Sequence, residues 1–499
     1  MWDVPFFVSV GRPLFLRAVV EASLEPLFID NQLFGFNARM KQQAADDTTA
    51  AGEYHAPWEK SFEKILTPFE EFIHRQNTSS LLLMGSAVLA LVLANGPFAS
   101  AYEHVMHTAI RVGIGNWMLE MSLHHWINDG LMAVFFFVVG LELKREILVG
   151  ELAKPRNAIL PIGAAIGGLV VPALIYFAIN PDGDAAAGWG IPMATDIAFA
   201  VGALALLAQR VPKALITFLV ALAIVDDLGA VMVIAVFYTD TIAIGPLAGA
   251  GGMFALLVLF NLAGIRKTLP YFIVAVFLWY ALLLSGVHAT LAGILGALSV
   301  PAMPKYNPER FSAHVKELMQ RFDASHQPGK NIMTNDALRA VVQTLENGVH
   351  AVEAPLQRLE HVWHMPVAYF VIPIFALANA GIPLEFASLG ETLAHPVLLG
   401  VSLGLVLGKF IGVTGASWLM LKLGVAVLPK DTRFTHIAGV SLLAGIGFTM
   451  SIFVAQLGFG GNDELLLMAK TGVLVASVFA GLAGLTWLYL TGTRPPAAD

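Results

Sequence analysis

Apolar segments of about 20 residues recur along this chain between Ser80 and Leu490. A helix of that length crosses a hydrocarbon core roughly 30 Å thick, because each helical residue rises about 1.5 Å. Hydrophobic residues make up 57% of the 499 residues and charged residues only 13%, which is not the composition of a water-soluble protein. The sequence therefore predicts an all-α, polytopic membrane protein.

Twelve candidate spans can be marked, and the seventh, eighth and ninth are short. They cover residues 80–97, 123–143, 158–179, 185–208, 214–237, 243–263, 269–284, 286–300, 367–380, 395–419, 436–457 and 465–490.

Lys and Arg gather in the loops that follow the second, fourth, sixth and tenth spans, as in Lys144-Arg145 and Arg266-Lys267. Acidic residues such as Asp182, Asp184 and Asp463 fall in the opposite loops. Because basic loops stay in the cytoplasm, both termini are expected there.

The expected layout has five parts. They are a cytoplasmic extension (1–79), spans one to eight (80–300), a cytoplasmic insertion (301–364), spans nine to twelve (365–490) and a cytoplasmic tail (491–499). Residues 58–72 suit an interfacial amphipathic helix, and the insertion has the pattern of amphipathic helices that form a solvated hairpin.

The chain has no cysteine, which excludes disulfides and thiolate metal sites, and its net charge of −7 gives no indication of nucleic-acid binding. We expect no cofactor.

Asp226 and Asp227 lie together within the apolar span 214–237. An aspartate at the bilayer centre costs about 2.5–3.5 kcal/mol on insertion scales, so the pair costs roughly 5–7 kcal/mol. Each strongly apolar residue returns only about 0.3–0.6 kcal/mol, which leaves insertion near break-even. The pair must therefore face protein or water, either as a functional site or as a structural partner of buried donors.

Neighbouring helical residues point about 100° apart, so one carboxylate can face a cation pathway while the other faces a second helix. Burial and mutual repulsion both disfavour the charged form of a carboxylate. Such a group can exchange a proton for a metal cation, and this competition is the chemistry of an antiporter.

Two spans contain helix breakers. Residues 188–196, GWGIPMATD, place Pro192 and the pair Thr195-Asp196 inside an apolar segment, with Thr195 as the expected N-cap of a new helix. Residues 444–451, AGIGFTMS, interrupt the eleventh span in a similar way. Paired breaks of this kind are typical of inverted-repeat transporters, in which helix ends meet at the membrane midplane, although an ordinary kinked helix would give the same local pattern.

Lys409 is flanked by apolar residues in the tenth span, away from the loops. A buried lysine needs an anion or loses its proton, so Asp226 or Asp227 is its natural partner. Lys409 could also offset the partly negative ends of broken helices, and Asp196 the partly positive ones.

Glu142 and Glu146 lie four residues apart, on one helical face, at the cytoplasmic end of the second span. They could form an acidic vestibule that attracts cations or senses pH, or an ordinary charged helix end. His288 could titrate near neutral pH or be a satisfied core histidine. His124, His125, His361 and His364 are interpreted as structural.

These residues point to a secondary transporter and not to an enzyme. A Na+-coupled symporter of an organic solute would also use broken helices. An intramembrane aspartyl protease needs its two aspartates on facing helices, whereas Asp226 and Asp227 are neighbours in sequence. A buried lysine that faces a carboxylate site is more consistent with a gated exchanger than with a channel.

Six segments carry a family resemblance over about residues 68–490, the insertion excepted. They are NDGLMAVFFFVVGLELKRE (128–146), IPMATDIAFAVGALALL (191–207), FLVALAIVDDLGAVMVIAVFYT (218–239), SGVHATLAG (285–293), PIFALANAG (373–381) and GIGFTMSIF (445–453). With these segments the sequence resembles the NhaA family of bacterial Na+/H+ antiporters.

The resemblance implies that Asp226 and Asp227 form the Na+ or Li+ site, with Asp227 as the more direct ligand. It implies that Thr195 and Asp196 lie at the first break and that Lys409 pairs with Asp226. Glu142, Glu146, Glu360 and His288 match positions associated with pH activation.

The resemblance also implies electrogenic exchange of Na+ or Li+ for H+ in the bacterial inner membrane. The expected fold is a twelve-span inverted repeat with two discontinuous helices, working by alternating access. Homodimerisation is expected, partly through residues 102–120. The extension and the insertion from 305 to about 357 depart from the family pattern.

Overall fold

The computed structural model describes residues 76–114, 117–239, 242–304, 308–325, 335–383 and 389–492. They belong to one compact unit, residues 73–499. Residues 1–75 of the expected extension, with its expected interfacial helix 58–72, lie outside the described residues, and so does the tail from residue 493.

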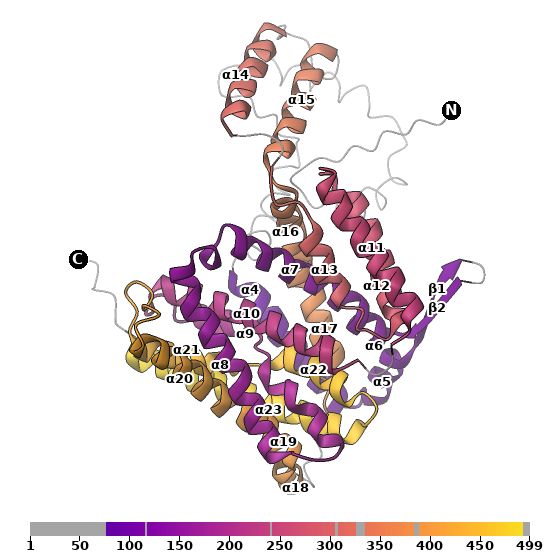
Figure 1. The fold of residues 1–499 in the computed structure, drawn as a ribbon. Coiled ribbons are helices and arrows are strands. Elements are labelled where there is room, and N and C mark those ends of the chain that lie inside the picture. Colours follow the sequence, from indigo (N-terminus) through magenta and orange to yellow (C-terminus); the bar gives the residue numbers. More distant parts are fainter. Residues whose placement is uncertain are drawn as a thin grey trace, which may run out of the picture. The chain divides into compact units, whose positions relative to one another are not determined.

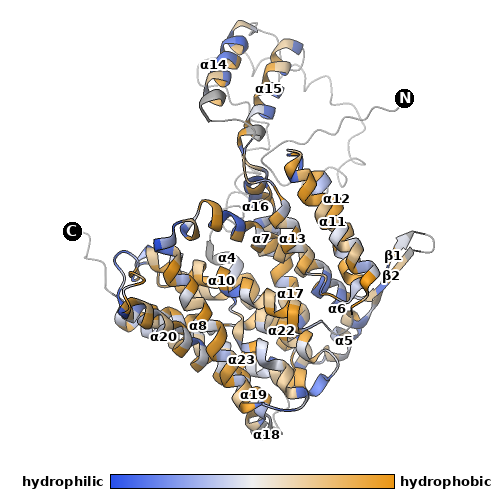
Figure 2. Ribbon diagram, in the orientation of Figure 1, coloured by the Kyte–Doolittle hydropathy of each residue, from blue (hydrophilic) through white to orange (hydrophobic). Residues whose placement is uncertain are grey.

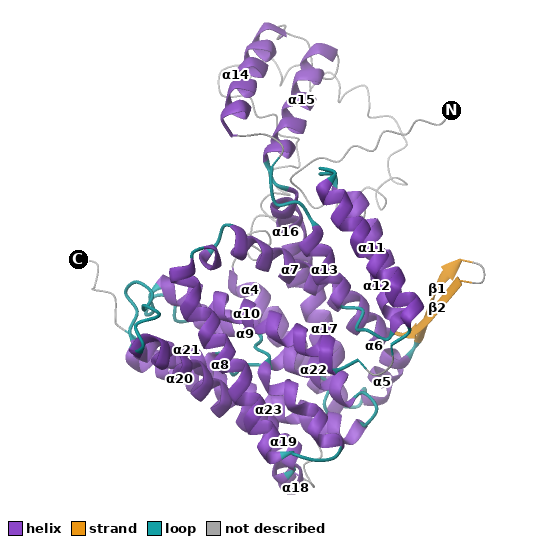
Figure 3. Ribbon diagram, in the orientation of Figure 1, coloured by secondary structure: helices purple, strands orange, loops and turns teal. Residues whose placement is uncertain are grey.

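Helices make up almost all of the described chain (Figures 1 and 3). The α-helices are α4 (Gln76–Asn95), α5 (Ala99–His107), α6 (Leu123–His125), α7 (Met132–Leu148), α8 (Pro155–Ile179), α9 (Ile197–Ala205), α10 (Lys213–Phe237), α11 (Ile244–Leu262), α12 (Thr268–Ser285), α13 (Leu291–Ser299), α14 (Pro308–Ser325), α15 (Asp336–Val352), α16 (Pro355–Pro366), α17 (Ile372–Asn379), α18 (Leu389–Ala394), α19 (Pro396–Leu403), α20 (Lys409–Lys422), α21 (Phe434–Leu443), α22 (Phe448–Phe459) and α23 (Asp463–Thr491). Tighter or wider helical turns are η2 (Trp126–Leu131), η3 (Glu151–Ala153), η4 (Asp184–Met193), η6 (Val367–Val371) and η8 (Gly404–Gly408).

Within the described residues, nine stretches are long and apolar enough to cross a membrane, and a bent pair makes up to ten. The nine are Thr78–Asn95, Pro155–Ile179, Asp184–Ala205, Lys213–Phe237, Ile244–Leu262, Thr268–Ser285, Pro355–Asn379, Pro396–Lys422 and Asp463–Thr491. The bent pair joins α21 to α22. Apolar residues predominate along these helices, whereas α14 and α15 carry more hydrophilic residues (Figure 2). The chain is thus a polytopic helical membrane protein.

Two of the twelve expected spans do not pass this test of length and hydropathy. Residues 123–148 are helical throughout, as α6, the π-helical turn η2 and α7 in succession. The expected eighth span, 286–300, contains only α13, which has 9 residues. A helix of that length covers about 14 Å. It starts late because Gly286, with φ 82°, ends α12 in a left-handed conformation and turns follow up to residue 290.

The expected ninth span, 367–380, is the last part of a longer helical stretch. Pro355 occupies the first turn of α16, where its missing N–H leaves no bond unmade. Pro366 does not end the helix, because the π-helical turn η6 follows it before α17. The boundary expected at residue 364 therefore falls inside a stretch that runs from Pro355 to Asn379.

A β-hairpin departs from the expected all-α fold. β1 (Ala109–Ile114) pairs antiparallel with β2 (Trp117–Ser122), and Arg111 lies opposite Glu120. Their side chains form an ion pair at 2.9 Å. The pairing raises the pKa of Arg111. β-branched, aromatic and cross-strand charged residues stabilise such a ribbon, and a search for long apolar spans does not detect this pattern.

The expected insertion contains the helices α14 and α15, which pack on each other. Leu318 and Leu338 are each 3% exposed and face this contact side of their helices, whereas Met319 is 44% exposed. The two helices therefore bury one apolar stripe each, as their sequence pattern predicts.

The spanning helices pack as two groups. The first helix group comprises η4, α8, α9, α10, α19, α20, α21, α22 and α23, which contact chiefly one another. The second helix group comprises α4, α7, α11, α12, α13, α16 and α17. The two groups meet mainly where α4 contacts α9, α7 contacts α10, and α17 contacts α22.

Candidate functional site

Extended backbone separates η4 from α9. η4 ends at Met193, and α9 begins at Ile197. Pro192 contributes no backbone donor at the end of η4. The Asp196 carboxylate accepts from the Phe199 N–H at 3.0 Å, so Asp196 is the N-cap of α9. The expectation of Thr195 as the cap was wrong, because the Thr195 hydroxyl is directed elsewhere.

A second interruption lies between α21, which ends at Leu443, and α22, which begins at Phe448, and the two helices are bent by 50°. The two interruptions contact each other, at a point named here the crossing. The Asp196 N–H donates to the Ile446 carbonyl at 2.7 Å, and the Thr195 hydroxyl lies 2.8 Å from the Ala444 carbonyl. Backbone groups that would be hydrogen-bonded within a continuous helix therefore form hydrogen bonds between the two interruptions.

Asp196 caps both helices that leave the crossing. One carboxylate oxygen accepts from Phe199 at the start of α9. The other accepts from the Thr449 N–H at 3.0 Å and the Thr449 hydroxyl at 2.5 Å, at the start of α22. Two partly positive helix N-termini thus face one buried carboxylate, which matches the expected offset of helix dipoles.

Asp226, which is fully buried on α10, is paired by two residues. Its Oδ2 atom accepts a charge-assisted hydrogen bond from Nζ of Lys409, which is also fully buried. The Thr195 hydroxyl lies 2.7 Å from the same oxygen, and its single proton can go to Asp226 or to Ala444. The structure thus brings Thr195, Asp226 and Lys409 together.

Asp227, which is 1% exposed, differs from Asp226 in its hydrogen bonding. Neither of its carboxylate oxygens has a hydrogen-bond partner in the described part of the chain, and the same holds for Oδ1 of Asp226. An isolated ionised carboxylate is costly in an apolar interior, so it needs a proton or a cation. Free carboxylate oxygens are also the ligands that hard cations prefer.

A glycine lets α8 pack closely on α20 beside the Asp226–Lys409 pair. Gly168 lies on α8, and a Cβ atom there would lie 3.7 Å from Oδ1 of Asp226 and 2.9 Å from Cγ2 of Val413. The second distance is shorter than carbon atoms tolerate without movement, so α8 can lie this close to α20 only without a side chain at residue 168.

The vestibule is defined here as Glu142, Glu146 and Glu360, with the two basic residues that contact them. Nε of Arg145 lies 2.9 Å from Glu360, and Arg145 also contacts Glu146 at 3.3 Å. His364 approaches Glu142 at 3.4 Å, an ion pair only if the histidine is protonated. The roles of Arg145 and His364 were missed, although Glu360 and His364 lie four residues apart on one face of α16.

His288 lies apart from the vestibule. Its Nε2 atom is 2.7 Å from the carbonyl of Tyr238, which follows α10. The Tyr238 hydroxyl in turn donates to the Ala187 carbonyl at 2.7 Å. His288 therefore belongs to the packing at the end of α10 opposite Lys213, and a pH-sensing role for it stays a prediction.

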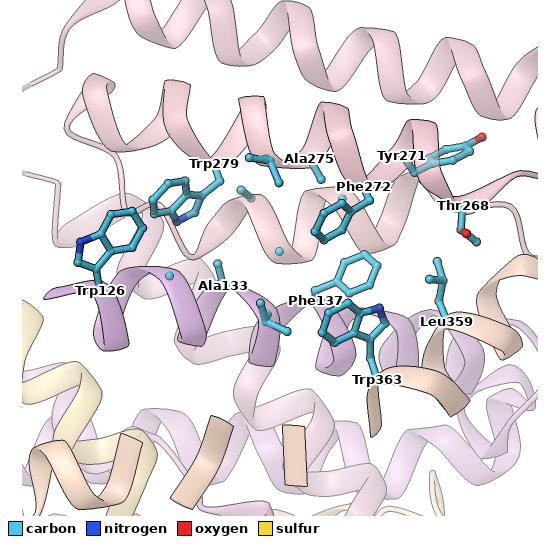
Figure 4. A pocket seen from close by; sticks show the side chains of 16 residues that line it. Trp126, Ala133, Phe137, Thr268, Tyr271, Phe272, Ala275, Trp279, Leu359 and Trp363 are labelled. Carbon is cyan, nitrogen blue, oxygen red and sulfur yellow. The ribbon is translucent and has the colours of Figure 1, made fainter. Parts of the chain in front are cut away.

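A separate apolar cavity of about 270 Å³ lies among α7, α12, α13 and α16 (Figure 4). Trp126 stacks on Trp279 at one end, with ring centroids 5.9 Å apart, and Phe272 stacks on Trp363 at the other, 6.4 Å apart. None of the described residues that line it carries a charged side chain. The cavity is therefore distinct from the carboxylate site.

Within the described residues, no three His, Asp or Glu side chains come together as a metal centre would require. Asp226 and Asp227 offer two carboxylates, one of which is already paired. This donor set suits a cation that binds and leaves, as a transported ion does.

Comparison with known proteins supports a transport role. The family described as Na+/H+ antiporter 1 matches residues 70–488. The chain is 55% identical to Na+/H+ antiporter NhaA 1 of Saccharophagus degradans over 87% of this chain and 94% of that protein. It is 52% identical to NhaA of Sulfurimonas denitrificans, over 87% of this chain and 98% of that protein.

A third relative, NhaA of Syntrophobacter fumaroxidans, is 51% identical over 87% of this chain and 93% of that protein. These relatives are named as antiporters, which are transporters and not enzymes. The chain belongs to the NhaA family of Na+/H+ antiporters.

Proposed function

We propose that this chain exchanges Na+ or Li+ for H+ across the bacterial inner membrane, with Asp227 as the principal cation ligand. The observation that carries the proposal is the contrast at the aspartate pair. Asp226 is neutralised by Lys409, whereas Asp227 is buried with both oxygens unpaired by the described chain. Asp227 is therefore the group that must take up either a proton or a metal cation.

Competition at Asp227 couples the two ions. A proton leaves the carboxyl when Na+ binds, and a proton returns when Na+ leaves, so one binding site serves both substrates in turn. Oδ1 of Asp226 is the other free oxygen of the pair and can complete the contact with the cation. Lys409 keeps the Asp226 charge compensated while Asp227 changes partner. In this proposal exchange is electrogenic, so more than one proton moves for each Na+ and a second proton is carried in addition to the one on Asp227.

The crossing of the two interruptions supports alternating access around a fixed site. In this proposal the chain has twelve spans in two inverted repeats, with the segments at 194–196 and 444–447 as the two discontinuous points. Two features set the charge around the ion: the helix N-termini that Asp196 caps, and the Lys409 cation. In this proposal the extension before α4, the insertion between α13 and α16 and the tail after α23 are cytoplasmic, and the apolar helical stretches lie in the membrane.

Glu142, Glu146 and Glu360 form the pH-responsive entrance in this proposal, with His288 as a further titratable residue. Three carboxylates that share Arg145 and His364 change their net charge as protons bind, and so change the local concentration of cations. The chain also acts as a homodimer in this proposal, and the hairpin of β1 and β2 within residues 102–120 is the expected contact.

Asp227→Asn tests the proposal directly. We expect loss of Na+-driven dissipation of a pH gradient in everted membrane vesicles, because an amide can neither release a proton nor neutralise a cation. Exchange should fall at least about 100-fold, as for removal of an essential charged group. Asp463→Asn, which changes an exposed carboxylate at the start of α23, is the matched control and should keep full exchange.

Exchange at a normal rate in Asp227→Asn would refute the assignment. Purified protein in liposomes without any organic solute separates antiport from Na+-coupled symport, because only an antiporter exchanges Na+ for H+ there.

A further inference from the structure

Four polar side chains form a closed hydrogen-bonded cluster at the end of α22. They are His124 from α6, Asn128 from η2, Asn379 from α17 and Gln456 from α22, named here the amide cluster. Asn128 donates to Gln456 at 2.6 Å, and Asn379 donates to Asn128 at 2.8 Å. Gln456 donates to Asn379 as well, and its Nε2 atom lies 3.1 Å from Nε2 of His124.

The amide cluster joins the two helix groups. His124, Asn128 and Asn379 lie on elements that pack with the second helix group, and Gln456 lies on α22 of the first. α17 and α22 form one of the few contacts between the groups. Gln456 therefore inserts one side chain into a cluster whose other members belong to the opposite group.

The cluster lies at the end of α7 that is remote from the vestibule. Asn128 lies in η2, the turn that directly precedes α7, whereas Glu142 lies in the second half of that helix. Gln456 follows Thr449, the partner of Asp196, by about two helical turns, or roughly 10 Å. The basic loops assign the vestibule end to the cytoplasm, so the amide cluster faces the extracytoplasmic side.

Aromatic rings close the space between the cluster and the crossing. Phe453 on α22 packs against Phe136 on α7, with ring centroids 5.6 Å apart, and against Phe375 on α17, at 6.3 Å. Each of the three residues is 1% exposed. The polar cluster and the rings therefore come from the same meeting of the two helix groups.

We propose that the amide cluster is a latch that holds the extracytoplasmic side of the ion path shut. The inference rests on the exchange function proposed above, because alternating access requires the two helix groups to part at this end. Opening must separate Gln456 from Asn128 and Asn379. In a low-dielectric environment, separating these amides costs free energy until water molecules take the place of the lost hydrogen-bond partners. The latch thus favours the conformation that is shut on this side.

Deleting the amide of Gln456 should raise the population of the open conformation about three- to tenfold, since one net hydrogen bond is worth about 1 kcal/mol and about 1.4 kcal/mol is a factor of ten. Gln456→Met keeps the length of the side chain and removes both hydrogen-bonding atoms. His124→Leu removes a partner from the other helix group.

Cysteine labelling measures the opening without relying on transport. The natural chain has no cysteine, so Ala376→Cys provides a single thiol. Ala376 is 1% exposed on α17, about one turn before Asn379. In right-side-out vesicles of the full-length protein, a membrane-impermeant methanethiosulfonate reagent should label this thiol about three to ten times faster when Gln456→Met or His124→Leu is added.

Asn180→Leu is the matched control. Asn180 is also a buried amide, 3% exposed, but it donates to the Pro396 carbonyl at 3.1 Å within the first helix group. Its removal should leave the labelling rate unchanged. The double variant Gln456→Met/His124→Leu should gain less than the product of the two single effects, because both residues act in one cluster.

Equal labelling rates in the Gln456→Met protein, the His124→Leu protein and the reporter background would overturn the latch. An equal rise in Asn180→Leu would overturn it too, because that rise would reflect general loosening. Labelling does not depend on exchange, so the two proposals can fail separately. Equal labelling rates would refute the latch and leave the role of Asp227 intact. Normal exchange in Asp227→Asn would refute the role of Asp227 and leave the labelling result interpretable. Folding of each variant is checked by size-exclusion chromatography in detergent.

Discussion

Carboxylates gather in two regions of this chain, the deep site with Asp196, Asp226 and Asp227 and the vestibule with Glu142, Glu146 and Glu360. In the vestibule each carboxylate contacts Arg145 or His364, and their side chains stay 13–24% exposed. In the deep site Asp196 is held by two helix ends and Asp226 by Lys409, but Asp227 has no partner in the described chain.

The difference shows how burial converts a missing partner into a binding site. A partly exposed carboxylate without a cation is stabilised by water, so its need for an ion is weak. A buried one cannot rely on water and must recruit a proton or a metal cation. We therefore expect substitutions in the deep site to abolish exchange or stability, and substitutions in the vestibule to change only its dependence on pH.

The largest effect among the following changes is expected for Lys409→Ala. Removing one partner of a buried ion pair leaves Asp226 uncompensated, which typically destabilises a protein by about 3–5 kcal/mol. Exchange should be severely reduced and the melting temperature in detergent should fall. The double variant Lys409→Ala/Asp226→Asn should recover stability but not exchange. A melting temperature equal to that of the unsubstituted protein would contradict the pairing argument.

Asp196→Ala should have the next largest effect. One side chain caps α9 and α22 together, and each lost cap costs about 0.5–2 kcal/mol, so the variant should lose roughly 1–4 kcal/mol. Denaturation in detergent measures this loss. Asn462→Ala, which removes the single cap of α23, is the matched control and should lose about half as much. Equal losses in both variants would argue against the double cap.

Arg145→Gln should have the smallest effect and tests the other side of the comparison. Without this cation the three vestibule carboxylates repel one another more strongly, so each holds a proton more readily. If their deprotonation activates exchange, the activity profile should move to higher pH by less than about one unit, with a similar maximal rate. Proton flux in vesicles across a pH series measures the shift. Loss of exchange at every pH would place Arg145 in the transport step.

The sequence predicts the pairing chemistry of the deep site better than its backbone. Lys409 and Asp226 are the obvious opposite charges in two apolar spans, and they do contact each other. The N-cap of α9 was assigned to Thr195 because nothing in the sequence shows that Ala444 and Asp226 compete for its hydroxyl. Such competition arises only once the two interruptions cross.

Other features depend on contacts between residues that are distant along the chain. Asn128, Asn379 and Gln456 are isolated amides in apolar segments, and only the packing of α17 on α22 shows that they meet. Likewise, the helical stretch from Pro355 to Asn379 continues past Pro366 through a π-helical turn, which a pattern of apolar residues does not predict. The amides were nevertheless a usable signal, because polar side chains in membrane spans seek one another.

The double cap at Asp196 has a mechanical consequence. Asp196 directly precedes α9, and its second carboxylate oxygen accepts from Thr449 on α22, so any motion that parts α9 from α22 breaks the two bonds to Thr449. A motion that carries both helices along together leaves every bond of Asp196 in place. Reorientation of α9 and α22 as one rigid unit therefore breaks fewer hydrogen bonds than the movement of either helix alone.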